Sequence, residues 1–220
     1  MKMPFTYSFP RPSVTVDSVV LRPHKGLIEV LLIKRGHDPF AGFYALPGGF
    51  LEMDEEPKLG AARELFEETE VEKIPLEPLL ACGQTGRDPR GRCVTLVFGA
   101  LINGDELNPK GGDDASEASW FALKSLPTMA FDHERVLRQV SKSLYWQAMT
   151  AVIGKNYLKE DFQEEEFSAL HKLVLADSPI GESALERGLR LNLIGPSSTP
   201  GFFRFIFSGY GFPDWSPWVW

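Results

Sequence analysis

The sequence predicts a two-domain α/β protein, with a mixed sheet between helices over residues 1–132 and a winged helix-turn-helix-like domain over residues 133–220. Strand-like stretches on both sides of one amphipathic helix predict the first domain. Three helical patterns followed by a Gly/Pro-rich hairpin tip predict the second. Charge also separates the two parts. Residues 135–220 hold nine Lys and Arg against nine Asp and Glu, so the net charge of -7 comes from the first part.

Four strands are predicted in the first domain from the spacing of its apolar residues. Residues 13–22 alternate in strand fashion, and residues 27–34 form a more continuous apolar stretch. The turn signal Pro23-His24-Lys25-Gly26 lies between them and predicts a hairpin. Two further strands are expected at residues 76–83 and 93–101.

One helix is expected to begin near Pro57, because proline is well tolerated at the first helical position. The acidic residues 54–56 would then lie at the positive end of the helix dipole. At about 100° per residue, Glu64, Glu67 and Glu68 fall on one face. The opposite face is expected to pack on the core and consists of Leu59, Ala62, Leu65 and Phe66.

The acidic face of this helix has two interpretations. A run of charges is usually a solvated surface. Here, however, only Arg63 is available to Glu67, so the three carboxylates repel one another unless a cation joins them. Hard oxygen ligands of this kind favour Mg2+ or Mn2+ as the cofactor.

The same segment carries a family resemblance. Pro47-Gly48-Gly49-Phe50-Leu51-Glu52, followed by Glu55, Arg63, Glu64, Leu65, Glu67 and Glu68, resembles the Nudix box. That box is the signature of hydrolases that cleave a nucleoside diphosphate linked to another moiety, and they have an α/β/α sandwich fold. The resemblance implies that Glu64, Glu67 and Glu68 coordinate metal and that the carbonyl of Gly48 adds a ligand. It also implies that Glu55 and Arg63 brace the loop and the helix, which completes the expected catalytic set.

One position departs from the family pattern, because Glu70 stands where the box usually has glycine. Glycine is favoured there because the helix ends in a left-handed residue. Two outcomes are open. Either the backbone is kept at a cost of about 1 kcal/mol, or the helix continues past this point. The metal ligands precede Glu70, so metal binding is expected in both cases.

The loop over residues 84–92 contains Arg87, Arg90 and Arg92 among glycines and a proline. These arginines are either a polar hairpin tip or donors to phosphate oxygens, for which the planar guanidinium is suited. The string resembles the corresponding loop of the ADP-ribose pyrophosphatase branch of the Nudix superfamily. We therefore expect the three arginines to bind substrate.

An acidic loop at residues 111–117 precedes the last expected strand of the first domain, again as in that branch. Asp113, Asp114 or Glu117 could supply a further ligand or a base for the attacking water. Any one of them alone is better explained as part of a capping cluster, and only the group suggests a role in the site. Asp132 is the expected N-cap of the next helix.

The second domain is predicted from helical spacing at residues 136–144, 164–176 and 183–193, followed by a hairpin tip and a strand at residues 202–207. Its order resembles that of ADP-ribose-responsive transcriptional regulators with a winged helix. DNA binding has weak support, because Arg187 and Arg190 are offset by Glu182 and Glu186 on the expected recognition helix. The aromatic tail at residues 210–220 is expected to dock on the core or on a second subunit of a homodimer.

Composition limits the remaining classes. No apolar stretch approaches the roughly 20 residues of a membrane span, and the start lacks a signal-peptide pattern, so a cytoplasmic location is expected. Cys82 and Cys93 are too few for a disulfide framework.

The motifs and the predicted domains leave two candidate functions. The first is an Mg2+-dependent pyrophosphohydrolase that splits ADP-ribose or a related nucleoside diphosphate derivative. The alternative is a transcriptional regulator that senses ADP-ribose or a sugar phosphate.

Overall fold

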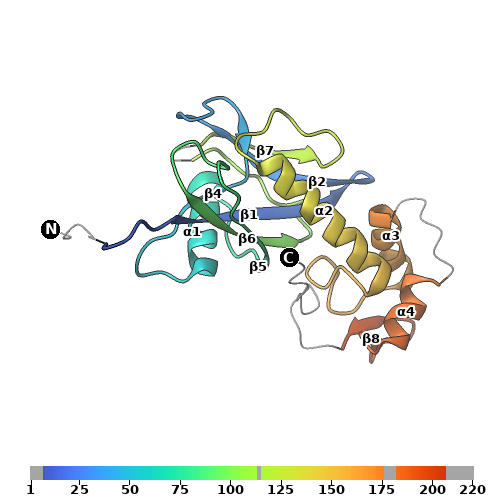
Figure 1. Ribbon diagram of the computed structural model, residues 1–220. Helices are drawn as coiled ribbons and strands as arrows, with labels where there is room; N and C mark the ends of the chain where they lie inside the picture. The colour runs from blue at the N-terminus through green and yellow to red at the C-terminus, as the bar shows by residue number, and fades with distance from the viewer. Residues whose placement is uncertain (1–6, 113–114, 176–181, 207–220) are drawn as a thin grey trace.

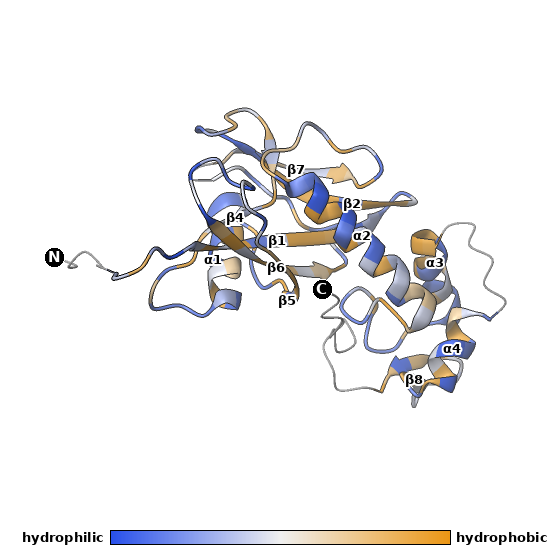
Figure 2. Ribbon diagram, in the orientation of Figure 1, coloured by the Kyte–Doolittle hydropathy of each residue, from blue (hydrophilic) through white to orange (hydrophobic). Residues whose placement is uncertain are grey.

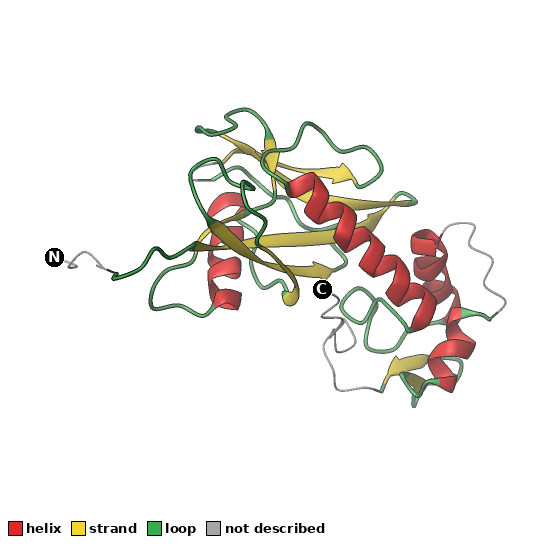
Figure 3. Ribbon diagram, viewed as in Figure 1, coloured by secondary structure: helices red, strands yellow, loops and turns green. Residues whose placement is uncertain are grey.

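The computed structural model describes residues 7–112, 115–175 and 182–206 (Figure 1). A large sheet forms the centre of the first part, and helices gather at one end of the molecule around a two-stranded hairpin (Figure 3). In chain order the elements are β1 (Ser13–His24), β2 (Leu27–Arg35), β3 (Tyr44–Ala45), β4 (Gly48–Phe50), α1 (Pro57–Thr69), β5 (Glu77–Cys82), β6 (Cys93–Leu101), β7 (Ala115–Ala122), α2 (His133–Thr150), α3 (Glu164–Leu175), α4 (Ala184–Arg190), β8 (Ile194–Pro196) and β9 (Phe203–Phe205).

The large sheet is mixed, as predicted. β1 pairs antiparallel with β2 and parallel with β6, so that the expected hairpin between the first two strands is confirmed. The sheet order is β3-β2-β1-β6-β5, with β4 added on β1 and β7 on β2. This order brings the β1–β4 pairing, which carries Gly48 and Gly49, next to the second half of α1.

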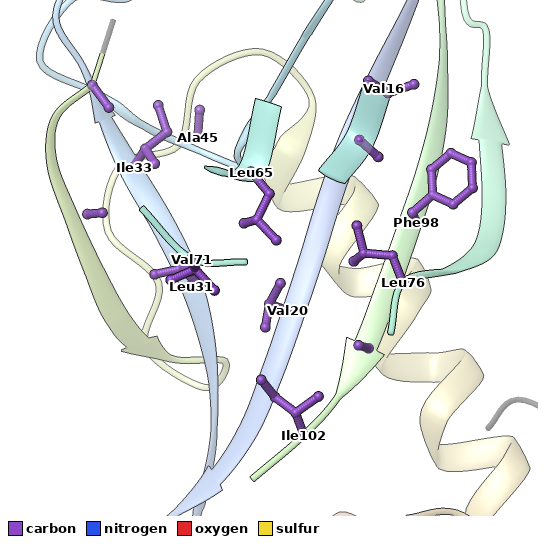
Figure 4. Packing of buried hydrophobic residues seen from close by; sticks show 14 of the residues in the cluster. Val16, Val20, Leu31, Ile33, Ala45, Leu65, Val71, Leu76, Phe98 and Ile102 are labelled. Atoms are coloured by element: carbon purple, nitrogen blue, oxygen red, sulfur yellow. The ribbon is translucent and has the colours of Figure 1, made fainter. Parts of the chain in front are cut away.

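Residues of the central strands alternate between two cores, which makes the fold a layered α/β/α arrangement. Val16 and Val20 of β1 join the cluster that contains Leu65 of α1 (Figure 4). Their neighbours Val19 and Leu21 join the cluster on the other side of the sheet, which α2 covers. Figure 2 shows hydrophobic residues along the central strands and hydrophilic residues on the outer surface of α2.

Of the apolar face predicted for α1, only Leu65 is buried in the core, and the prediction is wrong for the other three residues. Leu59 and Phe66 are 62% and 50% exposed, and Ala62 is also exposed. The buried face instead contains Gly60, Ala61, Leu65, Glu68 and Thr69. Small residues at 60 and 61 allow close approach, and the helix is rotated so that carboxylates enter the protein rather than solvent. The packing of the helix therefore favours the polar contacts of Glu68 over burial of Phe66.

Glu70 keeps the left-handed conformation of the usual glycine. Its φ angle is 57°, its N–H donates to the carbonyl of Phe66, and the helix ends at Thr69. Its carboxylate pairs with Lys110 at 2.9 Å on the surface. Of the two outcomes left open by the sequence, the structure has the first, in which a non-glycine residue bears the strain.

Replacing Glu70 separates this strain from the surface ion pair. Glu70→Ala removes the pair and keeps the Cβ, whereas Glu70→Gly removes both. We expect the glycine variant to exceed the alanine variant in free energy of unfolding by about 1 kcal/mol. Urea unfolding of the two variants measures the difference, and equal stabilities would show that the left-handed residue is not strained.

The C-terminal helices continue from the first part without a gap in packing. Val136, Leu137 and Val140 of α2 lie in the core beneath the sheet, so the predicted boundary between residues 132 and 133 stays a prediction. The expected helices at 164–176 and 183–193 correspond to α3 and α4, and the strand at 202–207 corresponds to β9. The element order agrees with a winged helix, which also stays a prediction. Asp113, Asp114 and the tail at 210–220 lie outside the described residues.

A buried histidine connects α3 to the segment after α2. Nε2 of His171 accepts from the N–H of Ile153 at 3.1 Å, and Nδ1 donates to the carbonyl of Phe167 at 2.9 Å. Burial lowers the pKa of His171 to about 4. The neutral ring is therefore the form that the fold requires.

This histidine should make stability depend on pH. Its folded pKa lies below the unfolded value of about 6.5, so its contribution is fully present above pH 6.5 and is lost as the pH falls toward 4. Between pH 7.5 and pH 5, we expect it to reduce the free energy of unfolding by about 2 kcal/mol. Urea unfolding of the wild type and His171→Gln at both pH values isolates the effect from that of His133. An equally steep pH dependence in the variant would contradict the assignment.

Among the described residues, no helix is both long and apolar enough to cross a membrane.

Candidate functional site

A polar cavity of about 430 Å³ lies between the β1–β4 pairing, α1 and the loop after β5. We call it the acidic cavity. Its lining combines glutamates, arginines and two phenylalanines, and comprises Thr15, Asp17, Ile33, Arg35, His37, Ala45, Leu46, Gly48, Gly49, Phe50, Leu51, Glu52, Arg63, Glu64, Glu68, Arg87, Asp88, Arg90, Phe131 and His133.

Helix α1 presents Glu64 and Glu68 to the loop that contains Gly48 and Gly49. The N–H of Gly48 donates to the carboxylate of Glu68 at 2.8 Å. A Cβ at Gly49 would lie 2.4 Å from a carboxylate oxygen of Glu64, so only glycine permits this approach. Burial raises the pKa of Glu64 and raises that of Glu68 to about 8. Two desolvated carboxyl groups side by side are poorly stabilised without a positive charge.

Arg63 is the positive charge that contacts Glu64. Its guanidinium forms a bidentate pair with Glu55, at 2.7 and 3.1 Å, which lowers the pKa of Glu55. It also donates to Glu64 and Glu67, both at 2.9 Å. Glu67 does not line the acidic cavity and its side chain is 42% exposed. The arginine thus ties the helix to the preceding loop and holds Glu67 at the rim.

The donor set fits a divalent cation. Glu64, Glu67 and Glu68 offer only oxygen ligands, and the loop at Gly48 and Gly49 closely approaches the carboxylates of Glu64 and Glu68. Within the described ranges, no three acidic, histidine or cysteine side chains already converge as a metal-binding group. Arg63 occupies oxygens of Glu64 and Glu67, so a bound cation would replace those hydrogen bonds.

Arg87 lies in the floor of the acidic cavity rather than at its opening. Its side chain is 5% exposed, and it donates to Asp132 at 2.7 and 3.2 Å. Asp17 lies 3.9 Å from the same guanidinium. Asp132 is the N-cap residue of α2, as predicted, although its side chain makes no capping hydrogen bond. The bidentate charged pair is the stronger interaction and takes the carboxylate.

Arg90 is the more accessible arginine of the acidic cavity, with a side chain that is 43% exposed. It pairs with Asp88 at 2.7 and 3.0 Å. Its guanidinium also lies over the rings of Phe50 and Phe131, at 5.0 and 5.4 Å from their centroids. The guanidinium of Arg35 contacts Phe131 as well, at 4.9 Å from its centroid. This arrangement supplies aromatic faces and cations at one wall of the cavity.

Two expected substrate-binding residues lie away from the acidic cavity. Arg92 donates to the backbone carbonyls of Gln84 and Cys93, and Glu117 accepts from Ser119 and Tyr44 on the sheet. Neither residue is part of the lining. Their binding roles stay predictions, without support from the position of these side chains.

Sequence reasoning missed several residues of the acidic cavity. Asp17, Arg35 and Phe131 line it, although they lie in strands or loops without a chemical motif. Phe50 could have been found, because it follows directly on the two box glycines. His133 also lines the cavity, and its Nδ1 accepts from the N–H of Leu46 at 3.0 Å in the interior.

The arginines expected on the DNA-facing helix are both engaged within the protein. Arg187 is 2% exposed and donates to the carbonyls of Ala148 and Ala151, at 2.6 and 2.9 Å. Arg187 therefore presents no free charge on this helix, because it satisfies carbonyls at the end of α2. Arg190 forms a bidentate pair with Glu182, at 2.8 and 3.0 Å, which confirms the expected offset by acidic residues.

Comparison with known proteins agrees with the resemblance to the Nudix box. The chain is 42% identical over 127 residues to an ADP-ribose pyrophosphatase of Methanocaldococcus jannaschii, a match that covers 58% of this chain and 72% of the relative. It is 29% identical over 171 residues to the ADPR responsive transcriptional repressor NtrR of Acinetobacter baylyi, covering 76% of this chain and 68% of the relative.

Solved structures extend the likeness into the C-terminal part. The structure of Shewanella oneidensis NrtR complexed with a 27mer DNA superposes with a TM-score of 0.68 at 26% identity, and the match covers 87% of this chain and 92% of the other. The sequence profile of the NUDIX domain matches residues 11–140, which is more than half of the chain. With the box residues gathered around one cavity on an α/β/α fold, the chain belongs to the Nudix family.

Proposed function

We propose that the protein is an Mg2+- or Mn2+-dependent Nudix hydrolase that cleaves the diphosphate of ADP-ribose or a related nucleoside diphosphate derivative. The close approach of the half-buried Glu64 and the buried Glu68 to the Gly48–Gly49 loop supports this proposal most directly. A pure sensor has no chemical need for three clustered carboxylates on one helix. The 42% identity to an ADP-ribose pyrophosphatase supports the choice of substrate class.

The proposed roles follow the geometry of the acidic cavity. Glu64, Glu67 and Glu68, with the carbonyl of Gly48, would hold the cation. When bound, a divalent metal ion neutralises the diphosphate and lowers the pKa of an attacking water. Arg63 and Glu55 keep the helix and the loop together, so the carboxylates stay in position when the substrate enters.

Arg90 is the proposed donor to phosphate oxygens, because its side chain is accessible. Its guanidinium can exchange the ion pair with Asp88 for an ion pair with a phosphate. Phe50 and Phe131, which already stack with guanidinium groups, would cover a planar part of the substrate. Arg87 is assigned to the floor of the acidic cavity, where it holds Asp132 in position and its positive charge offsets the negative charge of Asp17. Substrate contacts by Arg92 and by Glu117 of β7 would require these side chains to move toward the acidic cavity.

A substrate panel tests the proposal. ADP-ribose, NAD, nucleotide sugars and dinucleoside polyphosphates are incubated with the protein and Mg2+ or Mn2+, and phosphatase-accessible monophosphates are measured. We expect ADP-ribose to be cleaved into two monophosphates, with no activity in excess chelator. Turnover of none of these compounds with either metal would refute the hydrolase.

A regulator that senses ADP-ribose is the second candidate. The NtrR relative and the DNA-bound NrtR structure match well beyond the Nudix domain, and this supports a regulatory C-terminal part. Arg187 and Arg190 are both occupied, so we rank DNA binding below hydrolysis. Fluorescence anisotropy of the full chain with genomic fragments, at low and moderate salt, distinguishes the two. Specific, salt-sensitive binding that ADP-ribose releases would place the regulator first.

We also propose that the protein forms a homodimer and is located in the cytoplasm, as predicted from the sequence. Light scattering of the purified chain at several concentrations tests the dimer, and a monomeric mass throughout would refute it.

A further inference from the structure

A second cavity, of about 400 Å³, lies between α2, the end of α3 and the edge of the sheet. We call it the helix cavity. Its described lining has no residue in common with that of the acidic cavity, and its volume is that of a small-molecule site. Figure 1 shows the β1–β2 turn beside α3, and β2 contacts that helix. The lining comprises Gly26, Leu27, Ile28, Leu123, Lys124, Leu126, Leu137, Arg138, Ser141, Lys142, Leu144, Leu173 and Val174.

The walls of the helix cavity are hydrocarbon. Leucine, isoleucine and valine side chains from four separate segments converge there, and Ser141 is the single uncharged polar side chain among the described lining residues. Leu27 is 39% exposed at the turn, while Ile28, Leu123 and Val174 are half-buried against the core beneath the sheet. Apolar surface that is hollowed and open to solvent gains free energy when an apolar group covers it.

The helix cavity also carries three cations and, along its described lining, no acidic side chain. Arg138 pairs with Glu134 one turn earlier on α2. Lys124 and Lys142 are exposed, and neither has an ion-pair partner within the part of the chain that the structure describes. This is a local excess of positive charge in a protein whose net charge is -7. Such an excess favours an anionic group at this place.

We propose that the helix cavity binds an amphiphilic anion, a hydrocarbon chain with a single carboxylate head. The chain would cover the leucine walls, and the head would lie between Lys124 and Lys142. A nucleotide fits poorly, because Ser141 is the single uncharged polar side chain that the described lining offers to a base or a ribose, and it lies among hydrocarbon walls. A neutral lipid would leave the two ammonium groups without a partner. The proposed ligand is a free monomer in solution and not the surface of a membrane.

Decanoate, titrated into the full chain by calorimetry below its micelle concentration, tests the proposal. We expect saturable binding of one molecule per chain, and a rise in the unfolding temperature with ligand concentration. Decanoate should bind about tenfold more tightly than octanoate, because two more methylene groups are buried. Decanol should bind about threefold to tenfold more weakly than decanoate, because it lacks the charge but keeps the chain.

Matched variants separate the contribution of the apolar walls to ligand binding from that of the two lysines. Lys142→Gln and Lys124→Gln should each weaken decanoate binding about threefold and leave decanol unchanged. Lys172→Gln removes one charge from α3 outside the helix cavity and should have no effect. Leu27→Trp, at a half-open position of the wall, should weaken both ligands about tenfold by filling the space.

Three results would overturn the proposal. The first is the absence of saturable decanoate binding by the wild type. The second is an equal loss in Lys172→Gln and Lys142→Gln, which would mean non-specific attraction to positive charge. The third is binding to phosphatidylglycerol vesicles without binding to monomeric decanoate, which would assign these residues to a membrane surface instead.

Discussion

Glu64→Gln and Glu68→Gln are each expected to lower kcat for ADP-ribose by at least about a hundredfold, with little loss of stability. Both carboxylates are desolvated beside the Gly48–Gly49 loop, and the amide removes charge from the cation site without changing the shape of the side chain. Burial raises the pKa of Glu68 to about 8, so an uncharged side chain at this position suits the fold without metal. We therefore expect the free energy of unfolding of Glu68→Gln to equal or exceed that of the wild type.

Two variants control for this result. Glu72→Gln changes an exposed carboxylate just beyond the helix, paired with Lys73 on the surface, and should leave kcat unchanged. Glu67→Gln should also reduce kcat, although its carboxylate now lies at the rim with Arg63. Activity that persists in chelator, or in the Glu64→Gln, Glu68→Gln double variant, would rule out the proposed mechanism.

Arg87→Ala is expected to destabilise the protein by about 3–5 kcal/mol, because it leaves the carboxylates of Asp132 and Asp17 in the interior without their cation. The Arg87 side chain is 5% exposed, and those of the two acids are 17% and 7% exposed. Urea unfolding at neutral pH measures the effect. This expectation differs from the one based on sequence, in which Arg87 binds the diphosphate and its loss affects only the substrate.

Arg90→Ala is the matched control from the same loop. Its side chain is much more exposed, so we expect a stability loss below about 1 kcal/mol together with a raised KM for ADP-ribose. If Arg87→Ala proved as stable as the wild type and raised only KM, Arg87 would be a substrate ligand and the assignment to the floor would be wrong.

Several features of this protein follow from the sequence because they depend on near neighbours. The start of α1 at Pro57 follows from proline geometry, and the β1–β2 hairpin from two apolar stretches around a glycine turn. The box residues lie within one loop and one helix, so their spacing alone brings Glu55, Arg63 and Glu64 together. The C-terminal helices were found from their apolar spacing.

The direction in which side chains face was decided by the tertiary structure. The sequence pattern placed Leu59 and Phe66 in the core, but α1 turns so that Glu68 is buried and these residues are exposed. The sequence predicted that Arg87 binds substrate and that Arg187 lies on the recognition helix, offset by acidic residues. Each is instead buried by partners about 40 positions away, at Asp132 and at the carbonyls of Ala148 and Ala151. The charge of a residue and the local sequence pattern around it do not specify such distant partners. They depend on how the sheet, α2 and α4 pack, and a buried guanidinium is stable only where that packing supplies acceptors.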